Sequence, residues 1–254
     1  WASSLSYFVR LAEESSWSKS FYVYMQACVA CETGDYTRAI ELFNNCHVLS
    51  NRKYGGKVIS VEQFVVRRAK LYEQGPDVAK PILAGLEMVY LFYGFAQMSS
   101  EDLQRALTHV DDILASHGDM SESDMAICSL VRGTCLKHLG KLDEAQALLT
   151  SVDSMTVGDE KWVIPFARFE VASIHFARAD LDAAVLQLQQ VRAIKYDYNF
   201  KVRLHFRTHL AYSEASRLSG GTLVAPEEQF DDEVDEEEEK ARQAILEGER
   251  ESRA

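Results

Sequence analysis

Two cysteines near the N-terminus have the spacing of a metal or redox site. Cys28 and Cys31 form a CxxC pair within the helical segment "WSKSFYVYMQACVACE". A structural zinc ion needs four ligands, and the sequence contains no second CxxC. We therefore expect both cysteines to pack as small apolar side chains, and we expect no metal site.

Two histidines further along the chain have the spacing of a metalloprotease helix. His205 and His209 lie four residues apart, so both would project from one helix face. In such enzymes a glutamate follows the first histidine and activates water, but Phe206 stands in that place here. We expect His205 and Arg207 to hydrogen-bond across neighbouring helices, with weak metal binding as the alternative.

Other reactive arrangements are incomplete. The segment "YGGKVIS" (residues 54–60) has glycines but lacks the GxxxxGK[ST] pattern and the preceding apolar strand of a phosphate loop. Its Lys57 is expected to be solvated or to face a partner. Asp111 and Asp112 are adjacent and should be solvated on different parts of a helix surface. We therefore expect no catalytic residue, no cofactor and no enzymatic activity.

The composition favours helices. The 254 residues include only four prolines and thirteen glycines, whereas good helix formers are abundant. A chain of this length can bury a sizeable core in one or two domains. We expect an all-α protein with almost no strand.

The charge is concentrated at one end of the sequence. Of the net charge of -12, residues 227–254 carry 13 acids and 4 bases, while residues 1–226 carry 26 acids and 23 bases. A nucleic-acid binder would show a basic stripe, so no nucleic-acid partner is expected. The acidic segment is either a solubilising tail or a docking segment.

Cysteine usage and hydropathy bear on the compartment. Five cysteines, all inside expected helices, favour a reducing environment. The longest nearly apolar run, residues 88–96, is far shorter than the ~20 residues that cross a bilayer. We expect an intracellular, cytoplasmic protein, with the nucleus or a lipid droplet as alternatives. Because the sequence begins with Trp1, an N-terminal signal or anchor could precede it.

Three segments repeat one pattern of small and apolar residues. Each has a turn residue, then an apolar residue after two positions, an alanine after five and a large apolar residue after nine. The sets are Gly34, Tyr36, Ala39 and Phe43; Gly140, Leu142, Ala145 and Leu149; and Ala179, Leu181, Ala184 and Leu188. A small residue also lies seven positions before each turn, as Ala27, Gly133 and Ala172.

The pattern is typical of tetratricopeptide-like helical hairpins. Glycine leaves the first helix at φ > 0, the small residues let two helices cross closely, and the larger groups fill the space between hairpins. Each hairpin needs neighbours to bury its faces, so the sequence predicts a stacked α-solenoid. We expect a repeat domain over 1–219, clearest at 17–48, 124–152 and 160–195, and an acidic linker with a C-terminal helix or tail over 220–254.

Less regular segments carry a resemblance to a known family. "YGGKVISVEQFVVRRAKLY", "ILAGLEMVYLFYGF", "VRGTCLKHLGKLDEAQALL", "VIPFARFEVASI" and "KVRLHFRTHLAYSEA", together with the first repeat, resemble the tetratricopeptide-repeat protein 39 family, which includes fungal inclusion-body clearance proteins. The resemblance extends from Trp17 to Ser216. Two departures are Phe92–Tyr93, where the family favours Trp–Asn, and Gln63, where it favours a basic residue.

The resemblance implies a helical-repeat scaffold without known catalytic residues that acts through protein partners. It also implies an association of some members with lipid droplets or inclusions. The chain would then be the C-terminal part of a family protein, with about half of the full length missing before it.

The candidate partner-binding site is the concave face, which the first helix of each hairpin should line. A groove with aromatic and polar groups suits an extended peptide or a helix. The alternative is that neighbouring helices of the chain fill this groove. The candidate residues are Tyr24, Cys28, Lys57, Leu130, Thr134, Lys137, Phe169, Ser173 and Phe176. The expected function is a scaffold or adaptor with protein partners; the alternative is a factor bound to a lipid-droplet or membrane surface.

Overall fold

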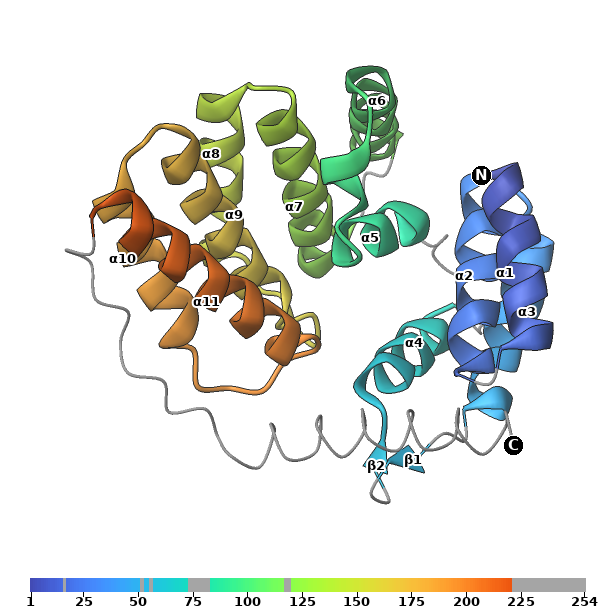
Figure 1. Ribbon diagram of the computed structural model, residues 1–254. Helices are drawn as coiled ribbons and strands as arrows, with labels where there is room; N and C mark the ends of the chain where they lie inside the picture. The colour runs from blue at the N-terminus through green and yellow to red at the C-terminus, as the bar shows by residue number, and fades with distance from the viewer. Residues whose placement is uncertain (16, 51–52, 55–56, 73–82, 117–119, 221–254) are drawn as a thin grey trace.

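The computed structural model describes residues 1–220, apart from 16, 51–52, 55–56, 73–82 and 117–119. Within these residues the chain is helical except for a two-stranded ladder (Figure 1), which confirms the all-α class. The ladder pairs β1 (Lys53–Tyr54) with β2 (Lys57–Val58) in antiparallel register. The predicted tail lies outside the described residues from 221 onwards.

The three predicted hairpins are confirmed. They are α2 (Lys19–Glu32) with α3 (Tyr36–Leu49), α7 (Glu122–His138) with α8 (Leu142–Ser151), and α9 (Val163–Ala177) with α10 (Leu181–Arg192). The alanine of each repeat is fully buried, and so is the large apolar residue four positions beyond it. These groups therefore fill the space that the repeat pattern assigns to them.

The turn residues explain how each first helix stops. Gly34 and Gly140 both have φ of 79°, and Ala179 has φ of 59° in the same place of the third hairpin. In the second hairpin, Gly140 N donates to Lys137 O at 3.0 Å and the next amide donates to Leu136 O at 2.9 Å. These bonds satisfy carbonyl groups at the helix end, and they require the left-handed conformation that glycine adopts at little cost.

The small residue before the turn permits close helix crossing. A Cβ atom added to Gly133 would lie 2.6 Å from Leu149 Cγ in the second helix of the hairpin. Leu149 is buried and cannot move aside. The expectation of a small side chain at this position is confirmed.

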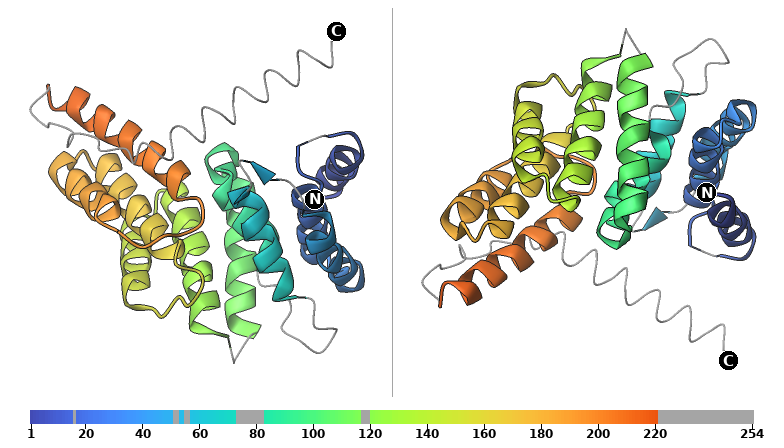
Figure 2. Two further views of the ribbon diagram at one scale, coloured as in Figure 1. Left: turned by 90° about the horizontal axis from the view of Figure 1, so that it is seen from below. Right: turned by 90° about the horizontal axis from the view of Figure 1, so that it is seen from above.

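Between the first and second hairpins the repeat pattern breaks down. This region contains α4 (Ser60–Lys70), α5 (Ala84–Leu91), the 3-10 helix η1 (Gly94–Gln97) and α6 (Ser100–Ser116). Helix α5 packs against both α2 and α7. In both views of Figure 2, α4, α5 and α6 lie between the N-terminal helices and the later hairpins.

Three further elements complete the fold. Helix α1 (Ala2–Glu14) packs on α2, α11 (Lys201–Leu218) packs on α10, and the short 3-10 helix η2 (Val152–Ser154) packs on α9. None of the described helices combines the length and the apolar character that a bilayer crossing requires.

Charged groups join the middle region to the third hairpin. The buried Glu160 accepts hydrogen bonds from Arg67 Nη2 at 2.9 Å, Arg68 Nη1 at 3.1 Å and Trp162 Nε1 at 2.8 Å. Arg68 is itself buried, and its Nη2 donates to Glu87 of α5 at 2.7 Å. These bonds fix α4 and α5 relative to the start of α9, because a buried charge must keep its partners.

The turn conformation gives a matched pair of substitutions. Ala179→Gly should raise the free energy of unfolding by about 0.5–1 kcal/mol, because glycine adopts the positive φ with less strain. Gly140→Ala should lower it by about 1 kcal/mol through the backbone alone, since a Cβ there meets nothing within 4 Å. Urea unfolding followed by circular dichroism measures both. Shifts of the same sign would contradict this account of the turns.

Candidate functional site

The candidate site is the inner face, which we define as the side of α7, α9 and α11 that carries Lys137, Glu170 and Arg207. The segment formed by α5 and η1 lies against this side. Both elements contact α7, and Tyr90 of α5 reaches α9. The predicted groove is thus partly filled by the chain itself, which was one of the two alternatives.

A buried carboxylate lies at the centre of the inner face. Glu170 forms an ion pair with Lys137 Nζ, accepts a hydrogen bond from Tyr90 Oη at 3.1 Å, and lies 3.8 Å from Arg207 Nη1. Burial raises the pKa of Glu170, but Lys137 and Arg207 outweigh it and hold the pKa below its usual value of 4.5. Glu170 is therefore an anion at neutral pH that joins α5, α7 and α11 to its own helix, α9.

Two arginines of α11 hold the end of α5 by their flat guanidinium groups. Arg207 lies 4.2 Å from the ring centroids of both Tyr93 and Phe169. Arg203 lies 4.6 Å from the ring centroid of Phe92, and its Nη1 donates to the backbone oxygen of Leu91 at 3.1 Å. The inner face thus binds residues 91–93 through the rings of Phe92 and Tyr93 and through the main-chain carbonyl of Leu91.

The buried cysteine thiols are poorly suited to act as nucleophiles. Burial raises the pKa of Cys31, Cys128 and Cys135 to about 12, so these thiols stay protonated at neutral pH. Among the described residues, no three His, Cys, Asp or Glu side chains gather closely enough to hold a metal ion.

Four of the predicted site residues do not line an open groove, and this expectation needs correction. Tyr24 and Cys28 of α2 are fully buried, with the Tyr24 ring 5.5 Å from that of Phe43. Leu130 and Thr134 of α7 are buried as well, and Thr134 Oγ1 donates to the backbone oxygen of Leu130. The first helices pack on both sides, so these positions face other helices of the chain and not solvent.

The remaining predicted residues fall into two groups. Lys137, Phe169, Ser173 and Phe176 lie close to the inner-face cluster: Lys137 pairs with Glu170, Phe169 stacks on Arg207, and the half-buried Ser173 donates to the backbone oxygen of Phe169. Phe176 is half-buried one turn further along α9. Lys57 belongs to β2, and its side chain is outside the described part of the structure.

Sequence reasoning found part of the cluster, since Lys137 and Phe169 were among the candidate residues. His205 and Arg207 were expected to hydrogen-bond across neighbouring helices, and this expectation needs correction. Arg207 Nη1 lies 3.8 Å from Glu170 of α9, which is an ion-pair distance, and His205 Nε2 has no hydrogen-bond partner among the described residues. Glu170 and Tyr90 were not foreseen. A glutamate in the mostly apolar stretch "VIPFARFEVASI" was the available signal, because a charge on a buried helix face requires a partner.

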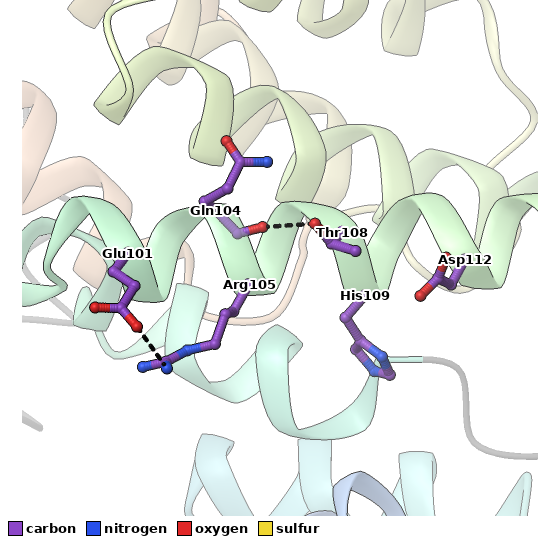
Figure 3. A pocket seen from close by; sticks show the side chains of 6 residues that line it. All are labelled: Glu101, Gln104, Arg105, Thr108, His109 and Asp112. Atoms are coloured by element: carbon purple, nitrogen blue, oxygen red, sulfur yellow. Dashed lines mark hydrogen bonds and ion pairs between the residues drawn. The ribbon is translucent and has the colours of Figure 1, made fainter.

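A separate hollow lies on α6 (Figure 3). It is lined by one side of that helix, at Glu101, Gln104, Arg105, Thr108, His109 and Asp112. Arg105 Nη1 donates to Glu101 at 3.0 Å, and Thr108 Oγ1 donates to the backbone oxygen of Gln104 at 3.0 Å. His109 Nε2 also pairs with Glu32 of α2 at 3.2 Å. These contacts lie within α6 or join it to a neighbouring helix, and we do not take this hollow as the functional site.

Comparison with known proteins is informative at the level of the family. A family model described as Iml2/Tetratricopeptide repeat protein 39 matches residues 1–139, which is more than half of the chain. The match includes the first hairpin, the irregular middle region and α7. The match stops before the α7–α8 turn. For residues 140–216, the similarity to the family is therefore the resemblance described above. No solved structure matches the chain.

The Glu170 cluster predicts an acid-sensitive contribution to stability. Glu170→Gln should lower the free energy of unfolding by about 3 kcal/mol at neutral pH, because Lys137 and Arg207 lose their buried counter-charge. The pKa of Glu170 is lowered by folding, so its contribution is present above pH 4.5 and is lost as the pH falls through the lowered value.

Urea unfolding at a series of pH values measures this effect, with the exposed pair Glu101–Arg105 as the control. Glu101→Gln should change the free energy of unfolding by less than about 0.5 kcal/mol. If Glu170→Gln unfolds with the same pH dependence as the unchanged chain, the carboxylate is not the stabilising anion.

Proposed function

Because the chain belongs to the Iml2/Tetratricopeptide repeat protein 39 family, we propose that it is a non-enzymatic scaffold that binds other proteins through its inner face. The observation that carries the proposal is the contact of Arg203 and Arg207 of α11 with residues 91–93. There the inner face holds a short segment of its own chain by two rings and a main-chain oxygen. A partner peptide placed beside this segment would meet the same kinds of group.

The part of the inner face that remains accessible supports this proposal. Ser173 and Phe176 are half-buried on α9, beyond the turn that carries Phe169. Lys137 is also partly accessible, and His138 at the end of α7 is exposed. A half-buried aromatic ring together with the partly accessible ammonium group of Lys137 suits a peptide that combines an apolar anchor with an acidic group.

A substitution within the accessible part tests the proposal. Ser173→Glu adds a larger, charged side chain to the inner face and should reduce the recovery of bound partners about tenfold, equivalent to about 1.4 kcal/mol. The readout is quantitative mass spectrometry of proteins retained by the full chain, followed by titration of the strongest partner.

The matched control is Thr108→Glu on α6. Like Ser173, Thr108 is a helical residue whose hydroxyl donates to the carbonyl four residues earlier, but it lies away from the inner face. Both variants should unfold at the temperature of the unchanged chain. Equal retention of the same partners by both variants would remove the inner face as the binding site.

Association with a lipid surface is the second candidate, and one observation favours it. Val202, Phe206 and Leu210 of α11 are 43%, 62% and 52% exposed and lie one turn apart, beside basic residues. An apolar stripe with basic flanks is suited to a lipid headgroup boundary. A role at lipid droplets, or in inclusion handling on such surfaces, would use this stripe.

A flotation experiment tests the lipid candidate. If the stripe meets lipid, the full chain should float with vesicles that contain anionic lipid, and Phe206→Ser should return it to the dense fraction. The control Val48→Ser changes an exposed apolar residue of α3, 68% exposed, and should leave flotation unchanged. A chain that stays in the dense fraction has no lipid role through α11.

A further inference from the structure

Helix α11 ends as the first helix of a hairpin ends. Gly220 has φ of 67°, close to the turn residues of the three hairpins. Ser219 N donates to Ala215 O at 3.0 Å, and Gly220 N donates to Arg217 O at 3.3 Å. The α7–α8 turn shows the same two bonds, from residues 139 and 140 to residues 135 and 137. The chain therefore leaves α11 in the conformation that elsewhere leads into a second helix.

The sequence of α11 fits the same role. Counting back seven positions from Gly220 gives Ser213, a small residue, as in the three complete hairpins. In the second hairpin this position is Gly133, which faces Leu149 of the second helix. Helix α11 thus has both marks of a first helix, and its second helix is not among the described residues.

The side of α11 that a second helix would cover is the exposed apolar stripe. At 100° per residue, Phe206 and Val202 lie within about 20° of Ser213, and Leu210 lies about 60° away. In α7 and α9 the corresponding side is packed against α8 and α10. The stripe is therefore a hairpin interface that the described residues leave uncovered.

The chain that follows has the charge to cover it. Helix α11 carries Lys201, Arg203, Arg207 and Arg217 against a single acid, Glu214. Arg217 pairs with Glu214 and Arg207 lies near Glu170, so Lys201 and Arg203 supply the remaining positive charge of the helix. Residues 227–239 contain ten acids and no base. Opposite charges of this kind favour docking of the acidic segment on α11, whereas the same segment would oppose the approach of an anionic lipid surface.

The apolar residues of the following segment have the matching spacing. Phe230, Val234, Ala241 and Ile245 recur at intervals that place them on one side of a helix. Pro226 followed by two glutamates is a typical helix start. We infer that residues 226–246 of the same chain form the second helix of a fourth hairpin and dock on the Val202–Phe206–Leu210 stripe.

Chain length permits this arrangement. Five residues, 221–225, connect Gly220 to Pro226 and can span about 17 Å, while packed helix axes lie about 8–10 Å apart. The connection also keeps the segment at a high effective concentration beside α11. Docking within one chain is therefore favoured over exchange between two copies.

Hydrogen exchange of the full chain, followed by mass spectrometry, tests the inference. Amides of residues 230–246 should exchange at least about tenfold more slowly than in an unstructured peptide. Phe206→Asp in α11, or Phe230→Asp with Val234→Asp in the segment, should remove that protection. The segment variants leave every described residue unchanged, so they separate lost docking from a damaged repeat domain. Val48→Asp, on the remote α3, should leave the protection intact.

Three results would overturn the inference. The first is exchange of residues 230–246 at the unstructured rate in the unchanged chain. The second is protection that disappears on dilution, which would identify a second copy as the occupant. The third is flotation of the full chain with anionic vesicles that depends on Phe206, which would identify lipid as the occupant. The first two bear on α11 alone and leave the inner-face binding proposal standing.

Discussion

The fold depends on keeping the buried charges of the middle region neutralised. Arg68 is nearly inaccessible to water, and leaving its guanidinium unpaired would cost several kcal/mol. Glu160 and Glu87 meet that requirement from two different parts of the chain. Because hydrogen bonds to charged groups demand close, directed contact, α4, α5 and the start of α9 have little freedom to shift. The position of α5 on the inner face follows from this restraint.

A contact with α11 offsets an unfavourable backbone conformation just after α5. Tyr93 has φ of 61°, where asparagine is far better tolerated than tyrosine, and asparagine is what the resembled family favours at this place. The strain is about 1–2 kcal/mol, and a desolvated contact between a ring and Arg207 is of similar size. The contact of the Tyr93 ring with Arg207 of α11 therefore offsets the backbone strain at Tyr93. This contact is a structural reason for the departure from the family pattern.

The hairpins could be predicted from sequence because their determinants are local. A residue that can turn, such as Gly140, and an alanine five positions later act within a single pair of helices. The site could not be predicted in the same way, because Tyr90 and Glu170 meet across 80 residues of sequence. The periodicity of apolar residues in the sequence does not predict this contact. The assumption that all first helices share one open face also failed for Tyr24, since α2 is enclosed by its own neighbours.

The long-range contacts have a consequence for how the chain folds and unfolds. In a regular repeat array each unit touches only adjacent units, so stretches of it can melt separately. Here Arg67 bonds Asn199 across 132 residues, and Arg203 bonds Leu91 across 112. Such contacts form only after large loops have closed, which slows folding and couples distant helices. Each hairpin can be recognised separately in the sequence, but these contacts link the hairpins, so unfolding of one helix should destabilise helices that are distant in sequence.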